Sequence, residues 1–123
     1  MPVTKKTVLL VDDELDICDF LSEYLQDRQI TSYYATDIEG ALAIACDHRI
    51  DIVFLDNNLL NQVNGVDYIP RFREINPQCK IYMLTANTTP EIKNRAERYG
   101  ADGFIAKPFE FAVFDRIIMG LRA

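Results

Sequence analysis

Short apolar runs alternate along the chain with stretches in which apolar residues recur at helical spacing. The runs are rich in β-branched and aromatic residues, and each ends at polar or turn residues, which is typical of buried strands. They occupy residues 7–11, 31–35, 51–55, 80–85 and 103–106. The pattern therefore predicts five strands.

The stretches between and after these runs predict five helices. The first begins near Glu14 and the second near Ile38, and in both the apolar residues follow the i, i+3, i+4, i+7, i+8 pattern. Weaker helical patterns lie at about 66–75, 90–99 and 110–121. The apolar stripes of the first, second and fifth predicted helices are Ile17, Phe20, Leu21, Tyr24 and Leu25; Ile38, Ala41, Leu42, Ala45 and Cys46; and Phe111, Phe114, Ile118 and Leu121.

Strands that alternate with helices predict an α/β fold built on a parallel sheet. Right-handed crossovers place helices on both faces of such a sheet. At 123 residues the chain has the usual size of one domain, so we expect a single domain over residues 1–123. Pro70 lies inside the third helical pattern and removes a backbone donor, so we expect that helix to start late or to have a distorted first turn.

Charge and cysteine content narrow the possible functions. A net charge of −6 disfavours direct binding to nucleic acid. No apolar run has the length of a signal segment or a membrane span, so we expect a soluble cytoplasmic protein. Cys18, Cys46 and Cys79 are odd in number and lack histidines at ligand spacing, which favours buried free thiols. The single histidine, His48, is expected at the surface near the end of the second helix.

Polar residues stand at the carboxyl ends of four predicted strands. Asp12 and Asp13 follow the first strand, Asp56 follows the third, Thr85 ends the fourth and Lys107 follows the fifth. Ligands of open α/β sheets bind outside the carboxyl ends of the strands, so we expect these side chains to meet at one rim. Taken singly, each has a simpler explanation, such as helix capping, a turn or a solvated surface charge.

Three carboxylates gathered at one rim indicate a cation site. Like charges a few ångströms apart raise each other's pKa and destabilise the fold unless a cation joins them. Oxygen ligands that leave part of the coordination shell open suit Mg²⁺, which keeps water molecules and accepts phosphate oxygens. Lys107 would then be a fixed positive charge for an incoming anion.

These residues, in this order and spacing, resemble the receiver domain of bacterial two-component response regulators, such as the chemotaxis regulators, over essentially the whole chain. The resemblance implies a flavodoxin-like, doubly wound (βα)5 fold with strand order 2-1-3-4-5. The motifs that carry it are "DD" at 12–13, the lone Asp56 ending the third strand, "TA" at 85–86, "GAD" at 100–102 and "KP" at 107–108.

The resemblance implies a ligand set for the metal. Asp13 and Asp56 would bind Mg²⁺ directly, with Mn²⁺ as an alternative ion, and Asp12 would bind it mainly through water. The backbone carbonyl of Asn58 would supply a further ligand. No other cofactor is implied.

The resemblance also assigns the phosphoryl chemistry and the switch. Asp56 would be the phosphoacceptor, Lys107 would pair with the phosphoryl group, and Thr85 would bind a phosphoryl oxygen. Phe104 occupies the aromatic switch position, toward which Thr85 would carry the signal. A cis peptide bond before Pro108 would point the lysine amine into the site.

The implied function is a phosphoacceptor signalling domain of a two-component or phosphorelay system. The donor would be a phosphohistidine on a sensor histidine kinase or histidine phosphotransfer protein, and the only catalysis would be self-phosphorylation and slow autodephosphorylation. The phosphorylated form would control an output domain or a partner protein. A homodimer through the fourth helix, fifth strand and fifth helix is one form of that output, with Val113 and Ile117 as added apolar surface. Neither nucleic acid nor a membrane is an expected direct partner.

The segment after Asp56 departs from the family pattern. Leu60 stands where the family has proline, and Gly65 lies nine residues after Asp56 where eight is common, so we expect a loop one residue longer. Asn58 and Asn87 occupy positions near the attacking water in family members and cannot act as carboxylate bases. We expect them to tune the lifetime of the phosphoryl group.

Two other functions are open at this point. A haloacid-dehalogenase-like phosphatase also forms an aspartyl phosphate on a doubly wound sheet, but its nucleophile ends the first strand in a D-x-D pattern, and here Glu14 stands two residues after Asp12. A phosphorylation-independent interaction domain would keep the fold without the chemistry. The retention of all five site residues argues against it.

Overall fold

The computed structural model describes residues 6–121 and contains a five-stranded parallel sheet. The pairing order is β2-β1-β3-β6-β7, which is the predicted order 2-1-3-4-5 when the two short strands outside this sheet are left out of the count. The predicted strands are thus confirmed. They are β1 (Thr7–Val11), β2 (Thr31–Ala35), β3 (Ile52–Leu55), β6 (Lys80–Thr85) and β7 (Gly103–Ala106).

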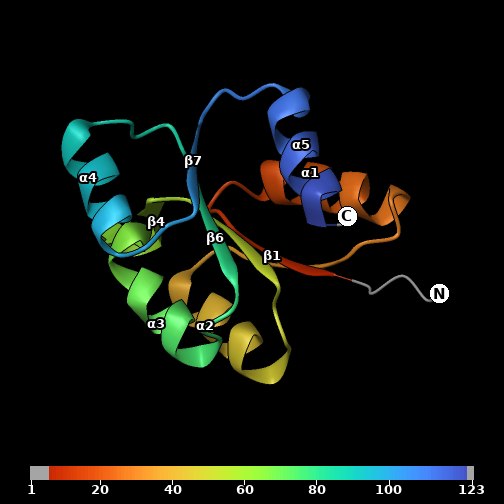
Figure 1. The fold of residues 1–123 in the computed structure, drawn as a ribbon, viewed down its shortest axis with the longest axis horizontal. Coiled ribbons are helices and arrows are strands. Elements are labelled where there is room, and N and C mark those ends of the chain that lie inside the picture. Colours follow the sequence, from red (N-terminus) through yellow and green to blue (C-terminus); the bar gives the residue numbers. More distant parts are fainter. Residues whose placement is uncertain (1–5, 122–123) are drawn as a thin grey trace.

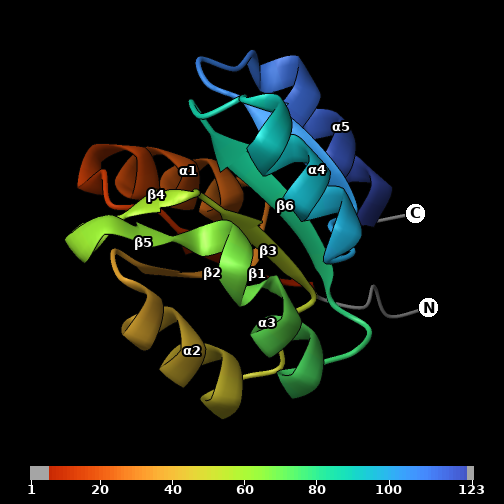
Figure 2. The ribbon, with the colours of Figure 1, turned by 90° about the vertical axis from the view of Figure 1, so that its left-hand side faces the viewer.

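Helices cover both faces of the sheet. Helices α1 and α5 lie on one face, and α2, α3 and α4 lie on the other (Figures 1 and 2). The predicted doubly wound α/β fold is therefore confirmed. The helices are α1 (Leu15–Asp27), α2 (Ile38–Asp47), α3 (Ile69–Ile75), α4 (Pro90–Arg98) and α5 (Phe111–Leu121).

The central strand β3 is buried on both faces, and its side chains alternate between two apolar layers. Val53 and Leu55 belong to the layer beneath α2, α3 and α4, whereas Ile52 and Phe54 belong to the layer beneath α1 and α5. Phe114 of α5 is fully buried, and its ring centroid lies 4.7 Å from that of Phe54. The sheet is thereby held rigidly between the two helix layers, and its carboxyl-end rim is fixed in place.

Three expectations about individual side chains are wrong. Cys46 is exposed, although Cys18 and Cys79 are buried free thiols as expected. Phe20 and Phe111 lie on the predicted core stripes, yet they are 55% and 39% exposed. Their rings meet edge to face at 5.1 Å across α1 and α5, because the stripe is wider than the sheet surface that the helix covers. The side chain of Leu121 lies outside the described part.

The segment between β3 and α3 contains structure that the sequence pattern did not predict. Strands β4 (Asn58–Leu59) and β5 (Val63–Asn64) form a two-stranded antiparallel ladder, shown side by side in Figure 2. We call residues 58–64 the short hairpin. A 3₁₀ turn, η2 (Gly65–Tyr68), follows, and α3 begins only at Ile69 with Pro70 in its first turn. The expected late start of this helix is confirmed.

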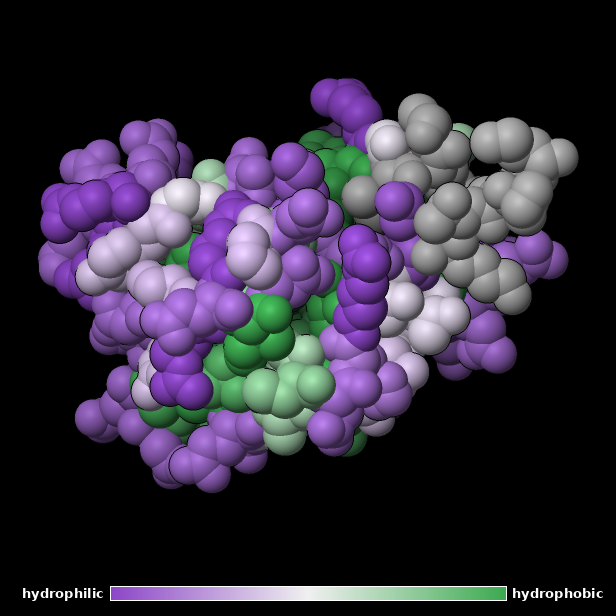
Figure 3. Space-filling model, turned by 60° about the horizontal axis from the view of Figure 1, so that its bottom comes forward, coloured by the Kyte–Doolittle hydropathy of each residue, from purple (hydrophilic) through white to green (hydrophobic). Residues whose placement is uncertain are grey.

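The surface on the side of α2 and α3 is mainly hydrophilic, and its largest hydrophobic area lies near the centre of the view (Figure 3). No helix within residues 6–121 combines the length and apolar character needed to cross a membrane. Residues 1–5, to which the expectation of no signal segment also applies, lie outside the described residues.

Candidate functional site

Three acidic side chains meet at the carboxyl-end rim of the sheet, as the sequence predicts. Asp12 and Asp13 follow β1, and Asp56 follows β3. Each contributes a carboxylate oxygen, and these oxygens all lie within 4.8 Å of one another. We call Asp12, Asp13 and Asp56 the acidic cluster.

The sheet itself positions the acidic cluster. The backbone N–H of Asp12 donates to the carbonyl of Ala35 at 3.1 Å, and that of Asp56 donates to the carbonyl of Val11 at 2.9 Å. These bonds extend the parallel ladders by one residue beyond the strands. Asp12 and Asp56 are only 3% and 4% exposed, whereas Asp13 is exposed and opens the cluster to solvent.

Lys107 reaches into the acidic cluster from the end of β7. Its Nζ lies 2.5 Å from Asp12 Oδ2 and 3.3 Å from Asp56 Oδ2, with Glu14 Oε1 at 3.6 Å. Its backbone N–H donates to the carbonyl of Thr85 at 2.9 Å. The peptide bond to Pro108 is cis, as predicted.

Burial and charge pairing act on these groups in opposite directions. Burial raises the pKa of Asp12, and the hydrogen bonds from Lys107 and from the Glu14 N–H reduce this effect without cancelling it. Burial alone would lower the pKa of Lys107, but the carboxylates of Asp12 and Asp56 outweigh it and raise that pKa above its ordinary value. The lysine is therefore held in its charged form.

The chemistry of the acidic cluster fits a hard divalent cation. All its side-chain donors are carboxylate oxygens, which are the ligands that such ions prefer. Three carboxylates beside one ammonium leave two negative charges without a partner among these four groups, a balance that one divalent ion would neutralise.

Thr85 and Phe104 lie on the neighbouring strands β6 and β7. Thr85 is fully buried, and its Oγ1 accepts a hydrogen bond from the Asn87 N–H at 3.1 Å. The register pairs Thr85 with Ala106 and Met83 with Phe104, so Thr85 and Phe104 are diagonal neighbours on the same face of the sheet. The ring of Phe104 is half-buried, and Lys93 Nζ lies 5.6 Å from its centroid.

Two residues that support the site have no role in the sequence-based hypothesis. Asn57 is fully buried and accepts hydrogen bonds from the Gly65 and Val66 N–H groups through its carbonyl and its Oδ1. A Cβ at Gly65 would lie 2.1 Å from the carbonyl oxygen of Asp56, so only glycine allows this approach. Both lie in the segment after Asp56 that the sequence predicts to be a loop, and no sequence pattern indicates that the Asn57 amide is buried.

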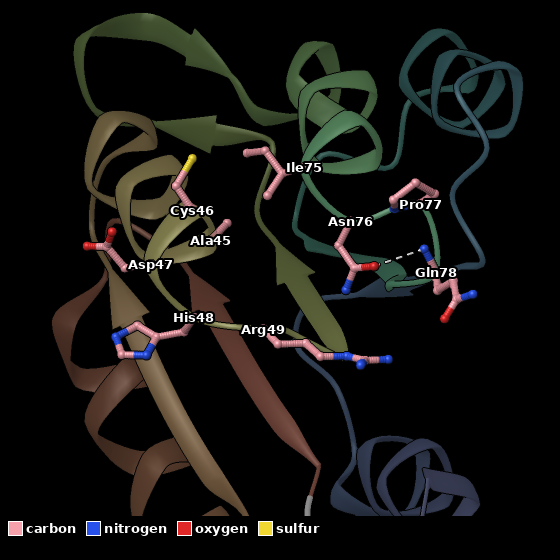
Figure 4. Close-up of a pocket in the computed structure, with 9 residues that line it drawn as sticks. All are labelled: Ala45, Cys46, Asp47, His48, Arg49, Ile75, Asn76, Pro77 and Gln78. Carbon is pink, nitrogen blue, oxygen red and sulfur yellow. Dashed lines mark hydrogen bonds between the residues drawn. The ribbon is translucent and has the colours of Figure 1, made fainter.

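Two cavities lie at opposite ends of the sheet. One, of about 410 Å³, adjoins Lys107 and is lined mainly by apolar groups, among them Ile17, Phe20 and Phe109. The other, of about 530 Å³, lies between the end of α2 and the loop after α3 (Figure 4). His48 lines this second cavity as an exposed residue, as expected, with its ring stacked on Tyr33 at 4.3 Å.

Comparison with known proteins decides the family. The model of the response regulator receiver domain matches residues 8–118. The chain belongs to this family. A receiver domain accepts a phosphoryl group on an aspartate in two-component signalling, so the predicted function class is confirmed, and an acidic site for a divalent metal is a property of the family.

Relatives cover nearly the whole receiver domain. The chain is 30% identical to the Vibrio cholerae chemotaxis protein CheY4, with a TM-score of 0.86 over 96% of this chain and 99% of that one. It is 32% identical over 117 residues to the probable transcriptional regulatory protein TcrX of Mycobacterium tuberculosis. It is 31% identical over 106 residues to the phosphate regulon transcriptional regulatory protein PhoB of Pseudomonas aeruginosa.

These matches differ in how much of the relative they include. The match to TcrX covers 95% of this chain but 48% of the relative, and the match to PhoB covers 85% of this chain and 46% of the relative. The receiver domain therefore spans about half the length of these curated relatives.

Proposed function

We propose that Asp56 accepts the phosphoryl group in this receiver domain, and that Asp12, Asp13 and the Asn58 carbonyl hold Mg²⁺ beside it. One observation carries this assignment. Asp56 is the acid that combines near-complete burial, a place at the end of the central strand and a Lys107 Nζ at 3.3 Å. Mn²⁺, which accepts the same oxygen donors, is the alternative ion.

The chemistry proceeds as an in-line displacement at phosphorus. A carboxylate oxygen of Asp56 attacks the phosphorus of a phosphohistidine, the P–N bond breaks, and the histidine nitrogen keeps the electron pair and takes up a proton. The Lys107 ammonium stabilises negative charge on the phosphoryl oxygens, since it is held charged within reach of Asp56. A divalent cation held by Asp12, Asp13 and the Asn58 carbonyl would supply further charge compensation there.

The resulting acyl phosphate is lost by slow hydrolysis. Asn58 and Asn87, near the route of the attacking water, offer amides and no carboxylate base. The receiver domain therefore catalyses its own phosphorylation and slow autodephosphorylation, and we propose no other enzymatic activity for it.

The switch begins at Thr85. Its Oγ1 accepts from the Asn87 N–H, which leaves the hydroxyl proton available for a phosphoryl oxygen. A phosphoryl group on Asp56 would favour the conformation in which Thr85 donates to it, and the space left on the same face of the sheet admits the Phe104 ring. Phosphorylation thus shifts a two-state equilibrium through a ligand that distinguishes the states.

The partners follow from this chemistry. We propose a sensor histidine kinase or histidine phosphotransfer protein as donor. An output domain or partner protein would respond to the switch, in keeping with the longer transcriptional regulators among the relatives.

The test is phosphorylation by acetyl phosphate with and without Mg²⁺, followed by intact-mass spectrometry. Asp56→Asn keeps the shape of the side chain and should abolish the Mg²⁺-dependent mass increase. Asp13→Asn removes one charge from the same rim, keeps the acceptor, and should slow the reaction and weaken Mg²⁺ binding. Full labelling of the Asp56→Asn protein would reject Asp56 as the acceptor.

A further inference from the structure

We propose that Asn57 is a positioning residue whose buried amide fixes the backbone of Asn58 beside Asp56 and thereby sets the affinity of the site for its divalent cation. The inference rests on the proposed function, because it concerns the ligand that the Asn58 carbonyl would supply. It adds a residue that neither binds the ion nor receives the phosphoryl group.

Asn57 makes hydrogen bonds at both ends of the short hairpin. Its carbonyl accepts from the Gly65 N–H at 2.7 Å, and its Oδ1 accepts from the Val66 N–H at 3.2 Å. Its Nδ2 lies 3.3 Å from Asn58 Oδ1, to which it donates. Both ends of residues 58–64 are therefore tied to one side chain and its own backbone, directly beside the phosphoacceptor.

Beyond the packing of Leu59 and Val63 against the core, the short hairpin has few contacts of its own that define its position. Its ladder contains only two residue pairs, Asn58 with Asn64 and Leu59 with Val63, and so short a hairpin is not stable alone. Asn61 and Gln62 both have positive φ, at 62° and 60°, which is unfavourable for residues with side chains. The packing of Leu59 holds the hairpin against the core, and the anchor at Asn57, together with the bond from the Asn58 N–H to Asp56 Oδ1 at 3.3 Å, fixes Asn58 at its start.

The burial of Asn57 makes this anchor sensitive to substitution. The side chain is 0% exposed, so water cannot replace the bonds that it makes. An apolar residue of similar size would fill the same space but would leave the Val66 N–H without its partner. The backbone between Asp56 and Gly65 would then be free to shift, while the sheet beneath it is unchanged.

The experiment compares Asn57→Leu with Asn76→Leu by isothermal titration calorimetry with Mg²⁺ on the unphosphorylated receiver domain. Asn76 is the matched control, since its side chain also makes two hydrogen bonds, donating to the Ile50 carbonyl at 2.8 Å and accepting from the Gln78 N–H at 3.1 Å. It lies by the cavity at the opposite end of the sheet (Figure 4). Urea denaturation of both variants measures the loss of stability separately.

We expect Asn57→Leu to raise the Mg²⁺ dissociation constant about 10-fold, as loss of an outer-shell partner does, and Asn76→Leu to leave it within about 2-fold of wild type. An unchanged constant in a folded Asn57→Leu protein would overturn the inference, and so would equal weakening in both variants. If Asn57→Leu does not fold, Asn57→Ser, which adds no bulk, is measured in its place against the same two outcomes. Failure of the wild type to bind Mg²⁺ would instead reject the proposed function.

Discussion

Asp12 is almost completely buried although its carboxylate lies beside two others. Burial raises its pKa above the ordinary value of 3.8, and Lys107 offsets only part of that effect. A carboxyl with a raised pKa in the folded state disfavours folding in its ionised form. The resulting loss of folding stability is absent below pH 3.8 and is fully present once the pH has risen above the pKa of Asp12 in the folded state. At neutral pH the ionised Asp12 therefore contributes a charge to the acidic cluster but lowers the free energy of unfolding.

We predict that Asp12→Asn increases the free energy of unfolding at pH 7 by on the order of 1 kcal/mol in the absence of divalent cations. The amide has a similar shape and can still accept from the Glu14 N–H, but it carries no charge into the cluster. Urea denaturation measures the difference, which should shrink as the pH falls toward 3.8 or when Mg²⁺ is added to the wild type.

Asp19→Asn is the control for this prediction, because it removes an exposed charge from α1, the helix that follows Asp12, and should change stability by less than about 0.5 kcal/mol. A destabilised Asp12→Asn protein at pH 7 would mean that the ion pair with Lys107 outweighs burial.

At the scale of elements, the sequence predicts what is regular and repeats. All five main strands and five helices follow from periodicity, because buried strands and amphipathic helices each repeat one pattern over several residues. The short hairpin could not be predicted from periodicity, since its strands have two residues each. Its shape depends on the hydrogen bonds that Asn57 accepts from the Gly65 and Val66 N–H groups, which no local pattern encodes.

The position of the charged site residues could be predicted from the sequence. These residues stand at strand ends, where topology alone brings them together. The exposure of Phe20 and Cys46 was not predictable, because periodicity gives the direction of a helix face and not its width relative to the sheet.

The approach of the η2 turn to Asp56 gives a second prediction. Gly65→Ala places a Cβ against the Asp56 carbonyl, at 2.1 Å before any relaxation, so it should lower the free energy of unfolding by at least about 2 kcal/mol and slow phosphorylation by acetyl phosphate. Gly120→Ala is the matched control. Nothing lies within 4 Å of its Cβ, and alanine at this helical position should stabilise by about 0.5–1 kcal/mol without affecting phosphorylation. Normal phosphorylation of a stable Gly65→Ala protein would contradict this account of the turn.

The exposed aromatic contact between α1 and α5 gives a third prediction, which concerns the phosphodonor. Phe20 and Phe111 line the cavity of about 410 Å³ beside Lys107, an apolar surface next to the proposed acceptor. Phe20→Ala should slow transfer from a histidine phosphotransfer protein that is active on the wild type, and should leave the rate with acetyl phosphate unchanged. Rapid-quench measurement of both reactions distinguishes an effect on docking of the donor protein from an effect on the chemistry at the site. Equal slowing with both donors would show that the substitution disturbs the site itself and not docking.

At the scale of the whole molecule, the site and the proposed output surface, formed by α4, β7 and α5, lie on connected elements. Phe104 of β7 and Val113 of α5 are partly or largely exposed, at the side where α4 and α5 flank the sheet edge. Two charged residues of α4 and α5, the helices that flank this surface, are engaged within the chain. Arg95 pairs with Asp67 and Glu91, and Asp115 pairs with Arg28. The apolar residues are thus the stronger candidates for contacts with another molecule.

The last prediction is that a phosphoryl mimic changes this surface. With beryllofluoride and Mg²⁺ bound at the site, Thr85 and Phe104 should move toward the site, and the α4–β7–α5 surface should pair with its copy in a second chain. Sedimentation velocity should then show a larger species that depends on the mimic, and Val113→Asp should remove it. Met119→Asp, on another flank of the same helix and also exposed, should not. Hydrogen exchange over residues 91–117 is the accompanying measurement, and protection that changes elsewhere but not there would reject this face as the output surface.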